Sequence, residues 1–274
     1  MRSQDEQLAE LMDTVLASAK YKEISPDLVR RIGWREIARR TNLKEAVKNT
    51  KSKLHQVGGA YFVSSKEYAG WLNDLKQLVS DAQQSELLAY LATIMRHHAS
   101  TRERLPILDQ FYQSLLADLP PIHSVLDLAC GLNPLALPWM HLAEPVEYYA
   151  CDIYQDMISF LREWLALLNI AGQVQVCDLV QTCPTQHVDL ALLLKALPCL
   201  EQIDKTAGFR LLQNIRAKYI IVSFPIQSLG GKGKGMEANY EAHFRTLSAD
   251  TGWSIKRFEF ATELAFLITK QDQS

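Results

Sequence analysis

The feature that most constrains the fold of this chain is an apolar run that ends in an acidic turn of small residues. The run extends from Val125 to Pro134 and reads Val-Leu-Asp-Leu-Ala-Cys-Gly-Leu-Asn-Pro. Its first half is typical of a buried strand, and its second half predicts a tight turn that opens a helix. In an open α/β sheet, ligands bind outside the carboxyl ends of the strands, where small residues let the backbone approach them. We therefore expect a nucleotide-like ligand beside Ala129 and Gly131.

This turn contains too few glycines for a dinucleotide. The pyrophosphate cradle of the G-x-G-x-x-G type needs three glycines, and the turn offers only Gly131. A nicotinamide dehydrogenase is therefore disfavoured. A cofactor that carries no phosphate would still fit the turn, and S-adenosylmethionine is such a cofactor.

Two further apolar runs also end in an acid. The first extends from Val146 to Asp152, and the second extends from Val174 through Asp178 to Leu179. A carboxylate at the end of the second strand accepts hydrogen bonds from ribose hydroxyls in Rossmann-like sheets, and Asp178 could accept one from an adenine amino group. A single aspartate at a strand end is as often a helix cap or a turn former. Three such strands in order, counting the one with Asp127, favour an adenosyl site.

Strand-like and helical segments alternate through the C-terminal half of the chain. Alternation of this kind predicts a parallel sheet with crossover helices. The last two strand-like segments are separated only by Ala261 and Thr262, which predicts a hairpin. A parallel sheet that closes with a hairpin is the class I methyltransferase fold. The expected strands are 188–194, 219–224, 253–260 and 263–269, and the expected helices are 157–168 and 209–215.

The first 120 residues show helical periodicity. Leu8, Leu11 and Val15, for example, recur at the spacing of one helix face. Pro120 and Pro121 would break the chain just before the first strand. We therefore expect an all-helical accessory domain over residues 1–120 and a methyltransferase domain over residues 121–274.

The charge of the chain is unevenly distributed. Its net charge is −2, but residues 20–60 contain eleven basic and four acidic residues, a net charge of +7. A run of charges alone most often marks a solvated helix face, but beside a methyltransferase-like domain it predicts a surface for RNA. The candidate RNA-binding residues are Lys20, Arg30, Arg31, Arg35, Arg39, Lys44, Lys48, Lys51 and Lys53.

Other features of the composition exclude several classes of protein. No apolar run approaches the length of a membrane span, and the N-terminus lacks the apolar core of a signal peptide, so a cytoplasmic protein is expected. The five cysteines are scattered and form no C-x-x-C pair. Neither a disulfide framework nor a metal site is therefore indicated. A monomer is the default expectation.

Longer motifs follow one another in an order that resembles a known family. They are Lys20-Tyr21, Pro26 to Arg31, Lys53 to His55, Gly59 to Tyr61, His98 to Arg104, Asp127 to Pro134, Leu192 to Glu201, Ser223 to Pro225, Gly235-Met236 and Asn239-Tyr240. Together they resemble the aminoglycoside-resistance 16S ribosomal RNA methyltransferases of the ArmA, Rmt and Sgm group over nearly the whole chain. The resemblance implies transfer of a methyl group from S-adenosylmethionine to N7 of guanine 1405, in the decoding site of 16S rRNA within the 30S subunit. Aminoglycoside resistance would follow.

The resemblance also implies a set of cofactor contacts. They fall on Tyr61, His98, Ala99, Ser100, Arg104, Ala129, Gly131, Asp152, Asp178, Leu179 and Leu194. Arg104 could pair with the methionine carboxylate of the cofactor in a bidentate geometry. The sequence departs from some relatives at Ile203, where they have a glutamine, so the polar contact of that glutamine is not expected here.

Methylation of guanine N7 needs no general base, because this nitrogen carries an in-plane lone pair and is unprotonated near neutral pH. Catalysis would consist mainly of positioning. The positioning candidates are Lys195, at the end of the fourth strand, and Met236; a surface lysine that only snorkels is an equally good interpretation of Lys195. In the glycine-rich loop before Met236, Lys232 and Lys234 could reach phosphates.

Two alternatives remain open from the sequence. Pro198-Cys199 resembles the nucleophile motif of cytosine-C5 methyltransferases, which attack the base covalently. The second cysteine motif of those RNA enzymes is missing, since Ser223-Phe-Pro225 stands in its place. The chain could also be a non-catalytic RNA-binding protein with a methyltransferase-like domain, although its strand-end acids argue against this.

Overall fold

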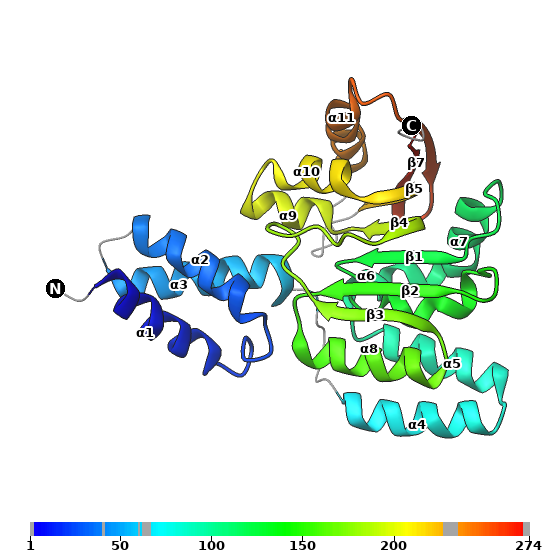
Figure 1. Cartoon of the computed structure of the whole chain (residues 1–274), viewed down its shortest axis with the longest axis horizontal. Helices are drawn as coiled ribbons and strands as arrows, with labels where there is room; N and C mark the ends of the chain where they lie inside the picture. Colours follow the sequence, from blue (N-terminus) through cyan, green and yellow to red (C-terminus); the bar gives the residue numbers. More distant parts are fainter. Residues whose placement is uncertain (1–2, 40–41, 60, 62–66, 227–234, 271–274) are drawn as a thin grey trace.

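A seven-stranded sheet forms the centre of the molecule (Figure 1), of which the computed structural model describes residues 3–39, 42–59, 61, 67–226 and 235–270. The strand order is β3-β2-β1-β4-β5-β7-β6. Strands β1 to β5 are parallel, and β7 runs antiparallel to both β5 and β6. The strands are β1 (Ser124–Leu128), β2 (Glu147–Asp152), β3 (Ala171–Val176), β4 (His187–Leu194), β5 (Arg216–Pro225), β6 (Ser254–Glu259) and β7 (Glu263–Thr269). The expected parallel sheet with a closing hairpin is therefore confirmed.

Helices cover both faces of this sheet, and each face has its own hydrophobic core. Val125 and Leu190 belong to one core, whereas their neighbours Leu126 and Ala191 belong to the other, because successive side chains of a strand point to opposite faces. The first core also contains residues of α4 (Tyr68–Ser80), α5 (Gln84–Met95), α7 (Leu108–Leu116) and α8 (Gln155–Leu167). The second contains residues of α9 (Leu197–Ile203), α10 (Ala207–Asn214) and α11 (Met236–Ser248).

The central and edge strands differ in composition as their burial requires. Strand β4 ends in the continuous apolar run from Leu190 to Leu194, which is buried on both faces. Strand β6 lies at the sheet edge and is largely exposed. Its Lys256 and Arg257 place charges on this edge, and charges there disfavour pairing with another chain.

Helices α1 (Gln4–Leu16), α2 (Pro26–Arg39) and α3 (Leu43–Leu54) pack on one another and form a lobe beside the sheet (Figure 1). The short π-helix η1 (His55–Gly59) follows α3, and residues 4–59 are called the helical lobe below. The N-terminal end of α1 is a capping box, in which Ser3 and Glu6 satisfy each other's backbone N–H groups.

The helices of residues 1–120, which were expected to form one accessory domain, pack in two separate groups. In Figure 1, helices α4, α5, α6 (Ala99–Arg104) and α7 lie with the sheet and its helix α8, whereas α1 to α3 lie apart from them. Helix α4 packs on α5 and α8, and α5 and α7 both pack on the 3-10 helix η3 (Asn133–Trp139) that follows β1. Helical periodicity reports which face of a helix is buried but not what buries it, so the sequence could not separate the two groups.

The helical lobe is joined to the sheet through the loop that follows β2. Ile24 forms an isolated antiparallel bridge with Tyr154. On either side of this bridge, the Ser25 N–H donates to the Ile153 carbonyl at 2.8 Å, and the Gln155 N–H donates to the Glu23 carbonyl at 2.8 Å. Backbone pairing therefore fixes the lobe next to the end of β2, where Asp152 lies.

Candidate cofactor site and active site

A cavity that is partly open to solvent lies at the carboxyl ends of the central strands, where it meets the helical lobe. Its lining includes many of the predicted cofactor residues, namely Tyr61, His98, Ser100, Ala129, Asp152, Asp178, Leu179 and Leu194. Leu28 of α2 and Val57 of η1 also line it, so the helical lobe provides part of the wall. Neither residue was among the cofactor contacts expected from the sequence.

The backbone takes an unusual conformation at two strand ends that line the cavity. Ala129 follows β1 with a φ of 51°, and Lys195 follows β4 with a φ of 59°. Residues other than glycine rarely adopt this left-handed conformation, and where they do the strain often marks a functional site. Both turns open immediately onto the cavity.

Gly131 holds the turn after β1 rather than lining the cavity. Its φ is 52°, and a Cβ atom at this position would lie 2.6 Å from Cε1 of His98. No side chain fits there without moving the imidazole. The Gly131 N–H donates to Oδ2 of Asp152 at 2.9 Å, while Oδ1 of Asp152 accepts from the Ile153 N–H at 2.6 Å. Two backbone donors therefore fix the Asp152 carboxylate at the cavity wall.

Tyr61 and His98 form a stacked pair at the cavity, with ring centroids 5.8 Å apart and an interplanar angle of 17°. Ala99, which does not line the cavity, donates its N–H to the Tyr61 carbonyl at 2.7 Å and so ties the two segments together. The Tyr61 hydroxyl lies 2.7 Å from Sγ of Cys199. Burial raises the pKa of the Cys199 thiol above its ordinary value, although the contact with Tyr61 acts in the opposite direction. A thiolate nucleophile requires a lowered pKa, so this site does not favour the covalent alternative.

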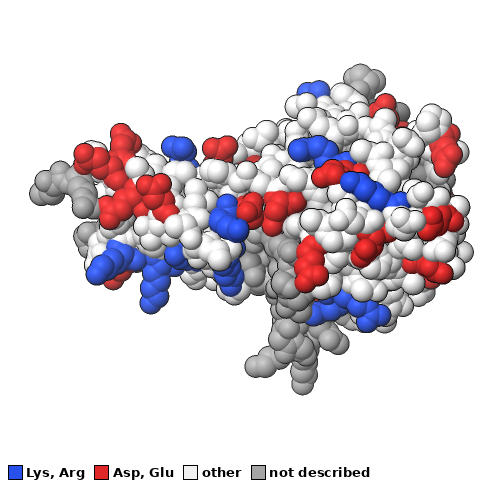
Figure 2. All heavy atoms as spheres, turned by 90° about the horizontal axis from the view of Figure 1, so that it is seen from below, with Lys and Arg blue, Asp and Glu red and all other residues white. Residues whose placement is uncertain are grey.

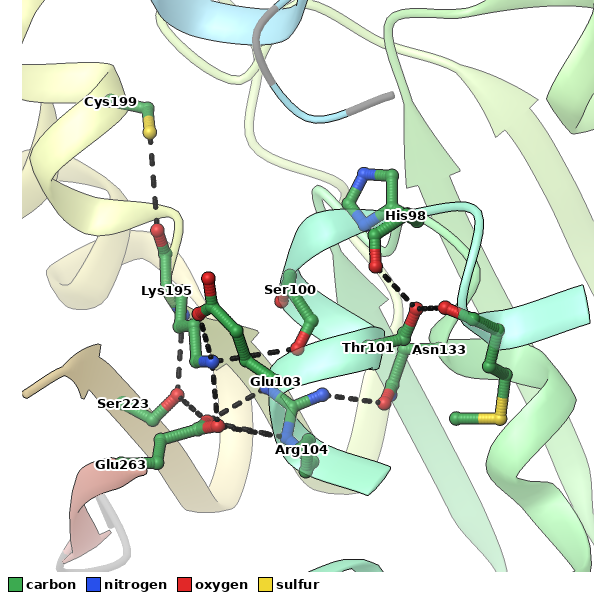
Figure 3. A network of polar contacts seen from close by, with 11 residues as sticks. His98, Ser100, Thr101, Glu103, Arg104, Asn133, Lys195, Cys199, Ser223 and Glu263 are labelled. Carbon is green, nitrogen blue, oxygen red and sulfur yellow. Dashed lines mark hydrogen bonds and ion pairs between the residues drawn. The ribbon is translucent and has the colours of Figure 1, made fainter. Parts of the chain in front are cut away.

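Lys195 is buried, and its ammonium group is surrounded by oxygen atoms (Figure 3). Nζ lies 3.0 Å from Oε2 of Glu103, 3.2 Å from Oε2 of Glu263 and 3.4 Å from the Ser100 carbonyl. The interpretation of Lys195 as a snorkelling surface residue is therefore wrong. The side chain lines the cavity, and two carboxylates compensate its charge.

Arg104 is fully buried behind the cavity and binds a carboxylate of the protein itself. Its Nη2 donates to Oε1 of Glu263 at 2.7 Å, its Nε donates to Oε2 at 3.1 Å, and its Nη1 donates to Oδ1 of Asn133 at 3.1 Å. Arg104 does not line the cavity. The expectation that it pairs with the methionine carboxylate is corrected here, because the carboxylate on its guanidinium belongs to Glu263 (Figure 3).

Glu263 connects the two cations. Burial alone would raise the pKa of its carboxyl group, but the charges of Arg104 and Lys195 outweigh burial and lower this pKa below its ordinary value. Ser223 Oγ also donates to Oε1 of Glu263. Sequence reasoning missed Glu263 because it begins a hairpin strand, 159 residues after Arg104.

The polar network continues to Asp127, at the end of β1. Its Oδ2 accepts hydrogen bonds from Nδ2 of Asn133 at 2.9 Å and from the Tyr148 hydroxyl at 2.8 Å. Burial raises the pKa of Asp127 to about 7, although these hydrogen bonds and the charge of Arg104 oppose the shift. Asp127 does not line the cavity, so it supports the turn from behind.

The candidate RNA-binding residues separate into two groups. Lys20, Arg30, Arg39, Lys44 and Lys48 are exposed, and Figure 2 shows basic side chains gathered along one edge of the helical lobe. The others are partly buried, namely Arg31, Arg35, Lys51 and Lys53.

Three of the partly buried residues contact protein groups. Arg31 binds the Asp178 carboxylate, Arg35 donates to the Ile203 carbonyl at 3.4 Å, and Lys53 pairs with the buried Glu36 at 2.7 Å. The expectation that Arg31 faces RNA is therefore corrected. Trp34 of α2, which the sequence analysis did not single out, is 43% exposed.

The remaining candidates lie around the start of α11. Met236 is the first residue of this helix and is partly buried, but it does not line the cavity. Lys232 and Lys234 lie outside the described residues. Within the described ranges, no group of three or more His, Cys, Asp or Glu side chains could hold a metal ion, and no helix is both long and apolar enough to cross a membrane.

Comparison with known proteins identifies the family and confirms the resemblance. A family model described as ribosomal RNA methyltransferase (FmrO) matches residues 17–267. A 16S rRNA (guanine(1405)-N(7))-methyltransferase from Frankia casuarinae is 40% identical over 271 residues, which cover 98% of this chain and 95% of the relative. The crystal structure of the 16S rRNA methyltransferase RmtF in complex with S-adenosyl-L-homocysteine has a TM-score of 0.82 at 31% identity, covering 97% of this chain and 99% of RmtF. The chain belongs to the FmrO family of ribosomal RNA methyltransferases.

Proposed function

We propose that this protein transfers the methyl group of S-adenosylmethionine to N7 of guanine 1405 in 16S rRNA. The observation that carries the proposal is the cavity at the strand ends, which combines two fixed carboxylates, Asp152 and Asp178, with a wall from a basic lobe. Relatives at 36–40% identity bear the name of this activity.

The residues of the cavity fit an adenosyl cofactor. Asp152, at the end of β2, would accept hydrogen bonds from the ribose hydroxyls. Asp178 would accept one from the adenine amino group, and Leu28, Leu179, Val180 and Ile203 provide apolar wall for the ring. S-adenosylmethionine, when bound, supplies an electrophilic methyl group on a sulfonium ion.

The charge of the cavity is compatible with a sulfonium ion. A buried, uncompensated ammonium group would repel a second cation strongly, because the interaction is poorly screened away from water. Glu103 and Glu263 both bind Nζ of Lys195, so the cation nearest to the cavity is already compensated. Lys195 and Ser100 can therefore orient polar groups of the methionine end without driving the sulfonium away.

The reaction requires positioning more than proton transfer. Guanine N7 attacks through its own lone pair, and alignment of nucleophile, methyl carbon and sulfur can provide on the order of 7–11 kcal/mol in favourable cases. The stacked Tyr61 and His98 rings and the Cys199 thiol would shape the wall against which the reacting groups lie. The raised pKa of Cys199 keeps the thiol protonated, so this residue provides volume rather than a nucleophile.

The helical lobe would bind the rRNA backbone. Its exposed basic residues, Lys20, Arg30, Arg39, Lys44 and Lys48, provide positive charge, and such charge binds folded RNA mainly through phosphates. Because a face of this kind reads shape rather than sequence, we propose the assembled 30S subunit as the substrate. Methylation there would confer aminoglycoside resistance on the host cell, and a monomer acting in the cytoplasm suffices for this activity.

Site-specific mapping of the methyl group tests the proposal. Purified protein is incubated with labelled S-adenosylmethionine and intact 30S subunits, and the rRNA is then treated with borohydride and aniline, which cleave at 7-methylguanine. We expect one new cleavage, at guanine 1405, with a higher yield from 30S subunits than from free 16S rRNA. Label on rRNA without this cleavage would place the methyl on another atom, and a lack of label with bound 30S subunits would favour a non-catalytic RNA-binding protein.

A further inference from the structure

Arg31 and Asp178 form an ion pair across the junction between the helical lobe and the cofactor cavity. Arg31 lies on α2, and Asp178 follows β3. Nε of Arg31 donates to Oδ2 of Asp178 at 2.7 Å, and Nη2 donates to Oδ1 at 2.9 Å. The two side chains are 11% and 10% exposed. This is the bidentate geometry in which a guanidinium fixes a carboxylate in both position and rotation.

The hydrogen bonds of the Asp178 carboxylate leave room for one more donor. A carboxylate has about four lone-pair sites. On Oδ1, one site accepts from Arg31 and a second accepts from the Val180 N–H at 3.1 Å. On Oδ2, the one hydrogen bond among the described residues comes from Nε of Arg31, whose Nη2 also lies 2.7 Å away. Asp178 lines the cavity, so the remaining site is available to a donor bound there.

The surroundings show that this part of the cavity depends on the helical lobe. Leu28, one turn before Arg31 on α2, lines the cavity itself. Arg35, one turn after Arg31, donates to the carbonyl of Ile203, which is another lining residue. One face of α2 thus supplies an apolar side chain to the cavity and holds two further parts of its wall.

We propose that Arg31 is a positioning residue for cofactor recognition, which holds the Asp178 carboxylate so that its open lone pair meets the adenine amino group. The proposal rests on the proposed cofactor site, in which Asp178 binds adenine. It adds that a residue of the RNA-binding lobe sets the selectivity for adenine. Contacts that shift α2 are thereby linked to the affinity for the cofactor.

The test compares two ligands that differ at one group. One is S-adenosylhomocysteine, and the other is its 6-deamino analogue, in which hydrogen replaces the adenine amino group. Isothermal titration of the full chain, without RNA, gives the ratio of the two Kd values. A hydrogen bond to a charged carboxylate makes this ratio about 10 to 100 for the wild-type protein. For Arg31→Met we expect the ratio to fall to a few-fold at most, and Arg31→Lys, with a single donor group, should lie between the two.

A matched control is Arg210 of α10, which contacts the loop that contains Asp178. Arg210 donates to the Val180 carbonyl at 3.0 Å but does not touch the Asp178 carboxylate. Arg210→Met should therefore keep the wild-type ratio. Thermal melting of each variant checks that it is folded, and Arg31→Lys retains the positive charge if Arg31→Met does not fold.

The outcomes distinguish the role of Arg31 from the proposed contact between Asp178 and the adenine amino group. If Asp178→Ala keeps the wild-type ratio, Asp178 does not bind the amino group, and the assignment itself fails. If Asp178→Ala lowers the ratio but both Arg31 variants keep it, the assignment stands and the role of Arg31 is overturned. Unchanged ratios in the Arg31 variants together with weaker 30S binding would return Arg31 to the RNA-binding surface.

Discussion

A buried arginine–carboxylate pair lies on each of two sides of the cofactor cavity, and the two pairs differ in what they join. Arg104 and Glu263 are completely buried and connect a helix on the sheet to the closing hairpin. Arg31 and Asp178 are slightly exposed and connect the helical lobe to the cavity wall. A pair enclosed within one core supports the fold, whereas a pair at a junction can connect two functions. Substitutions in the enclosed network should therefore reduce stability, whereas substitutions at the cavity and on the lobe should mainly change ligand or RNA binding.

The largest effect is expected from Arg104→Met. Arg104 provides three of the hydrogen bonds to the buried Glu263 carboxylate and leaves it only Lys195 as a cation when removed; loss of one partner of a buried pair costs about 3–5 kcal/mol of stability. Arg257→Met is the control, because Arg257 also pairs with carboxylates but is 35% exposed; such pairs contribute about 1 kcal/mol or less. Urea unfolding measures both variants. Equal losses would show that the Arg104 pair has no special role in the fold.

The pH dependence of stability tests Asp127, which is connected to the enclosed Arg104 pair through Asn133. Its pKa is about 7 in the folded protein because it is buried, which is well above that of an unfolded aspartate. Between about pH 4 and pH 7 the folded state therefore holds a proton that the unfolded state has lost. The free energy of unfolding should fall as pH rises through this window, by at most about 1.4 kcal/mol per pH unit, and Asp127→Asn should lack this component. Parallel curves for the two proteins would contradict the raised pKa.

Asp152 lines the cavity and belongs to neither arginine–carboxylate pair, so its loss should affect ligand binding more than folding. Asp152→Ala removes the expected acceptors for the ribose and should raise the Kd for S-adenosylhomocysteine about 10- to 100-fold. Asp118→Ala, at a carboxylate that is 75% exposed, is the control. Calorimetric titration measures both. A Kd within twofold of wild type for Asp152→Ala would place the ribose elsewhere.

A smaller effect is expected on the outer face of the helical lobe. The double variant Lys44→Gln/Lys48→Gln removes two exposed charges from α3. Each lost phosphate contact should reduce the slope of log affinity for 30S subunits against log salt by about one. Affinity for S-adenosylhomocysteine should not change. Lys76→Gln, an exposed lysine of α4, provides the control; an equal change in slope there would show that the attraction is not localised on the lobe.

The smallest effect is expected at Cys199. Cys199→Ala removes a protonated thiol that touches Tyr61 and Lys195, so methylation of 30S subunits should continue at a rate within about tenfold of wild type, a loss typical of altered packing. Complete loss of turnover, together with correct folding, would instead support covalent attack by the thiol.

The sequence predicted most strands because their signal is local. The run from Leu190 to Leu194 and the two-residue spacer between the last two strand-like segments place β4, β6 and β7 to within about two residues. Strand β3 begins earlier than expected, at Ala171, because Ala171 and Gly172 pair with Glu147 and Tyr148 of β2. The helix expected after β1 is a 3-10 helix, and Pro134 and Pro138 within it remove backbone donors that an α-helix would use.

The sequence placed the carboxylates Asp152 and Asp178 at the cavity, but it could not identify the carboxylates that bind Arg31 and Arg104. Asp178 and Arg31 are 147 residues apart, and Arg104 and Glu263 are 159 residues apart. No periodicity reports a contact over such a separation. Both arginines were assigned to ligands because their side chains can bind anions, and the structure supplies each of them with a carboxylate of the protein.

A crystal structure of the protein with S-adenosylhomocysteine tests the central claim most directly. We predict the ribose hydroxyls on Asp152 and the adenine amino group on Oδ2 of Asp178, with the bidentate bonds from Arg31 to Asp178 still in place. An adenine ring bound away from Asp178, or an Arg31 side chain released from that carboxylate, would contradict the account.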